Sequence, residues 1–177
     1  MMPEFSRPHR LGAGEIRRVE LRANTGECAA LAARFAIPAV ERLEARLTLA
    51  PETGGTTRLT GTLEADVVQD CVVTLDPVPQ QVRARLDLRI LPPGTPATDD
   101  DPDSPDEVET TGNSVDLGEV VAEQLALALD PYPRAPDAAI PAELEGAPDE
   151  PEVDSSSDEP GADRPNPFAA LARIKRH

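Results

Sequence analysis

Residues 59–67 read Leu-Thr-Gly-Thr-Leu-Glu-Ala-Asp-Val, with apolar or small side chains at the odd positions and polar side chains at the even ones. This period of two is typical of a β-strand with one buried face, because successive side chains point to opposite faces of a sheet. The same alternation occurs in three further runs, residues 16–22, 43–49 and 82–90. Alternating runs joined by turns predict an α+β fold, an antiparallel β-sheet or small β-barrel with one or two packed helices.

Between two of these runs the alternation resumes after Asp70, with Cys71, Val73 and Leu75 on one face. This predicts another inward-facing strand, which Asp76-Pro77-Val78-Pro79 is expected to break. A free cysteine at such a position behaves as a small hydrophobe, so Cys71 is expected to be structural. The alternatives are a metal ligand or a redox-active thiol.

Two helices are predicted from their start signals. Asn24 and Glu27 have the spacing of a capping box, and so do Asp116 and Glu119. Each pair precedes a stripe of apolar residues with helical spacing. The first helix is expected to end near Pro38, and the second to end before residues 130–133 and to pack on the sheet.

The negative charge is concentrated in two segments. The chain has 177 residues, a net charge of −16 and 33 acidic residues. Residues 99–111 carry seven of these acids and residues 141–163 carry nine, with no lysine or arginine in either stretch; the rest of the chain is balanced, seventeen against seventeen. Such segments bury too little to offset the entropy of ordering and are expected to be disordered, either as arms for a basic partner or as solubilising linkers.

These features divide the chain into five regions. They are a mainly β core with one helix at 1–94, a disordered acidic loop at 95–113, a docking helix at 114–133, a disordered acidic tail at 134–164 and a short helical motif at 165–177. In the last region Asn166 is a suitable N-cap and Pro167 fits the first helical position. Phe168 and Leu171 then share one face. So short a helix is marginal alone, so it packs on its own domain or folds in a partner's groove.

The chemistry-bearing residues argue against an enzyme. The two histidines, His9 and His177, lie near the ends of the chain, which disfavours a histidine-based triad or metal site. No phosphate-binding glycine loop is present. We expect no cofactor, no catalytic residues and no small-molecule substrate. Two cysteines do not form a disulfide scaffold, and the sequence contains neither a signal peptide nor an apolar run of membrane-spanning length, so a cytoplasmic location is expected.

Arginines on predicted strands leave open a direct contact with RNA. Arg83, Arg85 and Arg89 share one strand face, and a second group lies near the N-terminus. Cationic side chains bind phosphates, but the chain lacks the aromatics needed for base stacking. The alternative is that these arginines are paired with neighbouring Glu and Asp residues at strand edges.

Four motifs in order resemble those of one family. They are Val67-Val-Gln-Asp-Cys-Val-Val-Thr-Leu-Asp-Pro-Val78, the Asp116–Leu129 helix, the Leu129-Asp-Pro-Tyr132-Pro133 turn, and Asn166-Pro167-Phe168-Ala-Ala-Leu171. Together they resemble the YceD-like family, the large ribosomal RNA subunit accumulation proteins, in its alphaproteobacterial form. The resemblance implies a role in ribosome assembly. Many relatives carry Cys-x-x-Cys, suggesting a metal; here Val68 occupies the first position and 133–139 has no cysteine, so no metal site is expected.

The main hypothesis is therefore a non-enzymatic factor in ribosome biogenesis that supports accumulation of large-subunit ribosomal RNA. Its partner would be a ribosomal protein or ribosomal RNA of the large subunit, with no membrane contact. The candidate interaction residues are Tyr132, Arg83, Arg85, Asn166, Pro167, Phe168 and Leu171. Two alternatives are an acidic chaperone for a basic ribosomal protein and a direct RNA-binding module.

Overall fold

The computed structural model describes residues 4–11, 15–97, 104–110 and 112–139, and the motif at Asn166–Leu171 lies outside them. The α+β prediction is confirmed. A five-stranded sheet has the order β2-β3-β4-β5-β6, and a second sheet pairs β1 with β7. The strands are β1 (Pro8–Arg10), β2 (Arg17–Arg22), β3 (Ala39–Pro51), β4 (Thr57–Asp70), β5 (Pro77–Ile90), β6 (Asp106–Val108) and β7 (Ser114–Asp116). The helices are α1 (Thr25–Phe35) and α2 (Leu117–Ala128), and Thr53–Gly55 forms a 3-10 turn.

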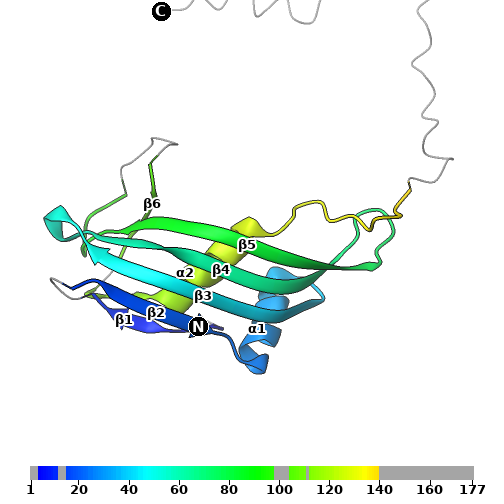
Figure 1. Cartoon of the computed structure of the whole chain (residues 1–177), viewed down its shortest axis with the longest axis horizontal. Coiled ribbons are helices and arrows are strands. Elements are labelled where there is room, and N and C mark those ends of the chain that lie inside the picture. The colour runs from blue at the N-terminus through cyan, green and yellow to red at the C-terminus, as the bar shows by residue number, and fades with distance from the viewer. Residues whose placement is uncertain (1–3, 12–14, 98–103, 111, 140–177) are drawn as a thin grey trace, which may run out of the picture. The chain divides into compact units, whose positions relative to one another are not determined.

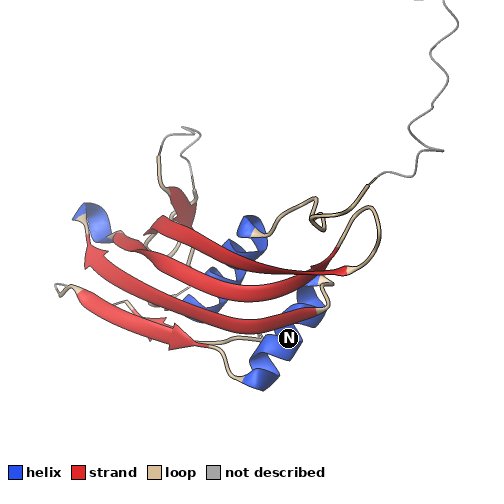
Figure 2. Cartoon of the chain, turned by 45° about the vertical axis from the view of Figure 1, so that its right-hand side comes forward, coloured by secondary structure: helices blue, strands red, loops and turns tan. Residues whose placement is uncertain are grey.

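Both helices cover the same face of the five-stranded sheet (Figures 1 and 2). The alternation in β4 explains why this face is covered, because Leu59, Leu63 and Val67 are at most 1% exposed while the even-numbered residues between them point to the other face. The inner-facing residues of β3 and β5 join them in one core with α1 and α2. Burial of this apolar area is the main stabilising term of the fold.

The N-terminal segment links the two helices. Phe5 is 1% exposed in the core, and the Asp116 carboxylate accepts hydrogen bonds from the Ser6 hydroxyl and, at 2.6 Å, from the Arg7 amide. Arg7 also pairs with Glu27 at 2.7 Å, at the start of α1. The segment lies so close to α2 that a Cβ on Gly118 would fall 1.9 Å from the Phe5 carbonyl oxygen. No sequence pattern had indicated this contact.

The predicted helix starts are found where expected. Asn24 and Glu27 form a complete capping box at α1. At α2, Asp116 accepts from the amides of Gly118 and Glu119, but the Glu119 carboxylate pairs with Arg34 at 2.6 Å instead of returning to the cap. The second capping box is therefore only half formed, because a guanidinium on α1 competes for its acid. In the described part of the chain, no helix has the length and apolar character needed to cross a membrane.

Two predictions around residues 71–79 are wrong. Cys71, Val73 and Leu75 do not continue a strand, since β4 ends at Asp70 and the chain turns. Pro77 and Pro79 do not break a strand but begin β5. Prolines are tolerated there because β6 pairs only with Leu88–Ile90, so this end of β5 is an edge that needs no further amide donors.

Part of the segment expected to be an acidic loop forms a strand. β6 pairs in parallel with the end of β5, Val108 opposite Ile90. The Leu91 amide donates to the Val108 carbonyl at 2.9 Å, and the buried Thr110 hydroxyl donates to the Leu91 carbonyl at 2.9 Å. The open edge of β5 thus supplies the hydrogen bonds that order these few residues.

Candidate interaction site

The connection between β4 and β5 is a tight turn braced by the chain that follows α2. The Gln69 side-chain amide donates to the Asp130 carbonyl at 3.0 Å, and the Val72 amide donates to the Pro133 carbonyl at 2.9 Å. Within the turn, the Cys71 amide donates to the Asp76 carbonyl at 2.8 Å. Figure 1 shows the segment after α2 running beside this turn. Two stretches about sixty residues apart therefore form one unit.

Cys71 is the buried centre of that unit. Its side chain is 0% exposed, and its Sγ accepts hydrogen bonds from the amides of Val73 (3.4 Å), Thr74 (3.5 Å) and Ala135 (3.4 Å). The Thr74 hydroxyl, followed by the Ala135 and Thr74 amides, lowers the pKa of Cys71 to about 7, against the small opposing effect of burial. The prediction that Cys71 points inward holds, but its surroundings are hydrogen-bond donors that stabilise a thiolate. It ties the turn to the chain at Ala135.

Three large apolar side chains project from this unit. Leu75 is 75% exposed, Tyr132 is 73% exposed and Val72 is 47% exposed, and we call these three residues the turn patch. Leu75 also has φ = 63°, in the left-handed region that a branched residue rarely adopts. Exposed apolar side chains on a strained, hydrogen-bonded turn and on the segment that braces it are typical of an interaction site.

One buried acceptor in the turn has no partner. Gln69 is 7% exposed, and while its Nε2 donates to Asp130, its Oε1 finds no donor among the described residues. A buried polar atom without a hydrogen bond costs about 1–3 kcal/mol. The glutamine is thus held by its bond to the segment after α2.

The structure separates the residues predicted as interaction candidates. Tyr132 belongs to the turn patch, with Cys71 beneath it. Arg83 and Arg85 are exposed on β5, and Arg83 lies six residues from Pro77, roughly 20 Å along the strand. Asn166, Pro167, Phe168 and Leu171 lie outside the described residues.

Sequence reasoning missed Val72 and Leu75 as surface residues. The alternation had assigned Leu75 to a buried strand face, and it gave no sign that Val72 belongs to an exposed apolar group. No local signal marks a leucine that will adopt a positive φ. The motif match around Cys71 was the only indication that this stretch matters.

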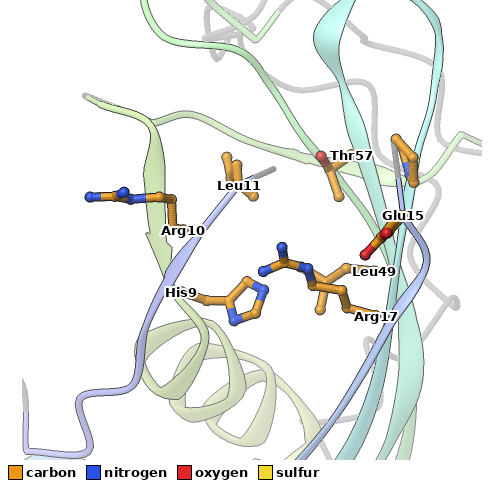
Figure 3. Close-up of a pocket in the computed structure, with 8 residues that line it drawn as sticks. His9, Arg10, Leu11, Glu15, Arg17, Leu49 and Thr57 are labelled. Atoms are coloured by element: carbon orange, nitrogen blue, oxygen red, sulfur yellow. The ribbon is translucent and has the colours of Figure 1, made fainter. Parts of the chain in front are cut away.

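A small pocket between β1 and the start of β2 brings His9 and Arg17 together, with Glu15 nearby (Figure 3). Its cavity volume of about 10 Å³ is room for one water molecule at most, too small for a substrate. Among the residues that the structure describes, no group of three or more His, Cys, Asp or Glu residues could hold a metal ion.

Comparison with known proteins finds a match to one family model. A family model described as "Large ribosomal RNA subunit accumulation protein YceD" matches residues 59–175, a range that includes the turn, α2 and Tyr132. No curated protein and no solved structure matches the chain.

Proposed function

Because this chain belongs to the YceD family of large ribosomal RNA subunit accumulation proteins, we propose that it is a non-enzymatic assembly factor that docks on a large-subunit component through the turn patch. The family is named for accumulation of large-subunit RNA and not for a reaction. We propose further that the protein acts by contact and not by catalysis, and that the turn patch is the surface in contact.

The exposure of Leu75, Tyr132 and Val72 is the observation that carries this proposal. Apolar side chains on a surface gain about 25 cal/mol for each Å² that a partner removes from water. The turn is already braced at Gln69, Cys71 and Val72, so little conformational entropy remains to be lost on binding. A prearranged apolar patch favours a partner with a complementary apolar surface.

Catalysis by the turn has no support in its chemistry. Cys71 is the one group there whose pKa is brought close to neutrality, and its sulfur is fully buried under the bonds that hold the turn. A nucleophile must reach its substrate, so we infer that this buried sulfur stabilises the turn and does not take part in a reaction. Phe168 and Leu171 remain predicted as a second apolar anchor, tethered by the acidic segment 141–163.

The experiment is complementation in cells from which the gene has been deleted, with the ratio of large- to small-subunit ribosomal RNA as readout. The wild type should restore the ratio, and the Val72→Ser/Leu75→Ser/Tyr132→Ser variant should not. The matched control is Ile16→Ser, since Ile16 is 69% exposed and precedes β2, whose first residues pair with the end of β3 farthest from the turn.

All variants must show the thermal midpoint of the wild type, within a few degrees, before their activity is compared. A triple variant that restores the ratio as well as Ile16→Ser would refute docking through the turn patch. A Phe168→Ala/Leu171→Ala variant tests the second anchor in the same cells. Full restoration by that variant would remove the anchor from the proposal.

A further inference from the structure

The face of the five-stranded sheet opposite the helices has no covering element in the described residues (Figure 2). We call it the outer sheet face; its side chains come from the alternate positions of β2 to β5 that do not enter the core. Leaving out Glu41 at the β-bulge, the face carries eight arginines and six acidic residues. A chain with a net charge of −16 thus displays one surface with an excess of positive charge.

Half of these arginines are neutralised by neighbours. Arg42 bonds Asp66 at 2.7 Å, and Arg58 bonds both carboxylate oxygens of Asp87, through Nε at 2.8 Å and Nη2 at 2.7 Å. Arg22 pairs with Glu44 at 2.9 Å. Arg89 pairs with Glu52 at 3.5 Å. Together with the contact between Arg42 and Glu64 at 3.9 Å, these pairs occupy four of the six carboxylates on the face.

The remaining four arginines make no ion pair within the described ranges: Arg18, Arg46, Arg83 and Arg85. All four are exposed. The expectation that the strand arginines are paired therefore fits Arg89 but not Arg83 or Arg85. Glu20, opposite Arg46 in the register, and Asp70, opposite Pro77 at the end of β4, are the acidic residues of this face that make no ion pair within the described ranges. They offset two of the four positive charges.

Threonines lie beside the unpaired arginines on the outer sheet face. In one row across the sheet, Thr62 lies between Arg46 and Arg85. Those two arginines stand two strands apart, about 9.6 Å, with an exposed small side chain between them. The next row places Thr48 beside Arg18, with Thr60 following. Small hydroxyl side chains leave space between the guanidinium groups and can themselves donate to phosphate oxygens.

We propose that the outer sheet face binds the phosphate backbone of ribosomal RNA through Arg18, Arg46, Arg83 and Arg85, which rests on the role in large-subunit RNA accumulation proposed above. Guanidinium groups without carboxylate partners keep all their donors for phosphate, the anion that arginine bonds in a fork geometry. The register positions that make up the face include no aromatic residue, so bases have nothing to stack on. Recognition is therefore of a double-helical backbone and independent of sequence.

The test measures fluorescence anisotropy of a labelled 20-base-pair RNA duplex with the purified full chain at 50 and 200 mM salt. Four phosphate contacts, at about 0.9 in the salt exponent each, predict that affinity falls about 150-fold over this range. The Arg46→Gln/Arg85→Gln variant keeps two contacts and should lose only about 12-fold over the same range, with weaker binding at 50 mM.

The matched control is Arg10→Gln/Arg17→Gln. It removes the same charge, both residues are exposed without ion pairs in the described residues, and they line the pocket of Figure 3 and not the outer sheet face. This control should bind as the wild type does. Equal salt dependence in the two double variants would overturn the proposal, and so would failure of the wild type to bind duplex RNA at 50 mM salt.

Polyglutamate of equal charge is the second probe. If it displaces the RNA as well as unlabelled duplex does, the face is a site for acidic protein segments and the RNA proposal is wrong. The binding assay and the complementation assay fail independently. A chain that restores RNA accumulation without binding the duplex would refute the outer sheet face alone, and a chain that binds the duplex through these arginines but restores nothing would refute the proposed function alone.

Discussion

Replacing Asp116 by alanine should remove the hydrogen bonds that hold the N-terminal segment against α2 and should lower the free energy of unfolding. The carboxylate is the N-cap of α2 and accepts from the amides of Gly118 at 3.0 Å and Glu119 at 3.2 Å. It also accepts from the Arg7 amide and the Ser6 hydroxyl. Burial raises the pKa of Asp116, but these four hydrogen bonds outweigh it, so the net shift is downward.

The magnitude follows from these contacts. Loss of the helix cap costs about 1 kcal/mol. Each of the two bonds to the N-terminal segment contributes about 1.5 kcal/mol, the low end for a charged acceptor, because both are only partly buried. The sum is a loss of about 4 kcal/mol in the free energy of unfolding, which corresponds to a thermal midpoint lower by roughly 12 °C.

The assay is urea unfolding followed by circular dichroism at pH 7, with Asn24→Ala as the matched control. Asn24 caps α1 without holding another segment, so its loss should cost about 1 kcal/mol. Because the folded pKa of Asp116 lies below its ordinary value, the stabilisation is complete above about pH 4 and disappears as the pH falls through the folded pKa. The difference between wild type and Asp116→Ala should therefore shrink in acid. Equal costs for the two cap variants would refute the idea that Asp116 joins the N-terminal segment to α2.

Three further results are expected. Leu75→Gly should raise the free energy of unfolding by about 1 kcal/mol in urea, because glycine adopts φ = 63° without strain; a loss would show that the leucine side chain packs on the turn. Gly118→Ala should cost about 3 kcal/mol from the clash with the Phe5 backbone, whereas Gly112→Ala, with nothing within 4 Å of the new Cβ, should be neutral in the same assay. Since the folded pKa of Cys71, about 7, lies below that of an unfolded cysteine, wild-type stability should rise between about pH 7 and pH 8.5, and Cys71→Ala should lack this rise and the matching thiolate absorbance.

Much of the fold could be predicted because its signals are local. The alternation in β3, β4 and β5 fixes which residues can share the core, and the oxygen of Asn24 can reach the amide of Glu27 in any context that permits a helix. These features depend on neighbours within a few residues. These three strands and this helix are therefore present in the structure, and only their end residues differ from the prediction.

The candidate site could not be predicted in the same way. Leu75 continues the apolar alternation of β4, so its sequence neighbours indicate burial, yet it is 75% exposed. Its position is set by Pro133 and Ala135, whose hydrogen bonds to Val72 and Cys71 fix the turn from about sixty residues away. Arg46 and Arg89 illustrate the same limit, since both alternate outward and only one finds a carboxylate.

The amino-acid sequence alone was sufficient to predict the class of fold, the helix starts and the buried faces of the strands, because periodicity and helix capping depend on residues close together in the chain. The tertiary structure was needed to show that amides bond Cys71, that Val72, Leu75 and Tyr132 are exposed, and that four arginines on the outer sheet face lack carboxylate partners in the described part of the chain. Each of those depends on which distant groups arrive at hydrogen-bonding distance, and that information lies in the assembled sheet and not in any stretch of its sequence.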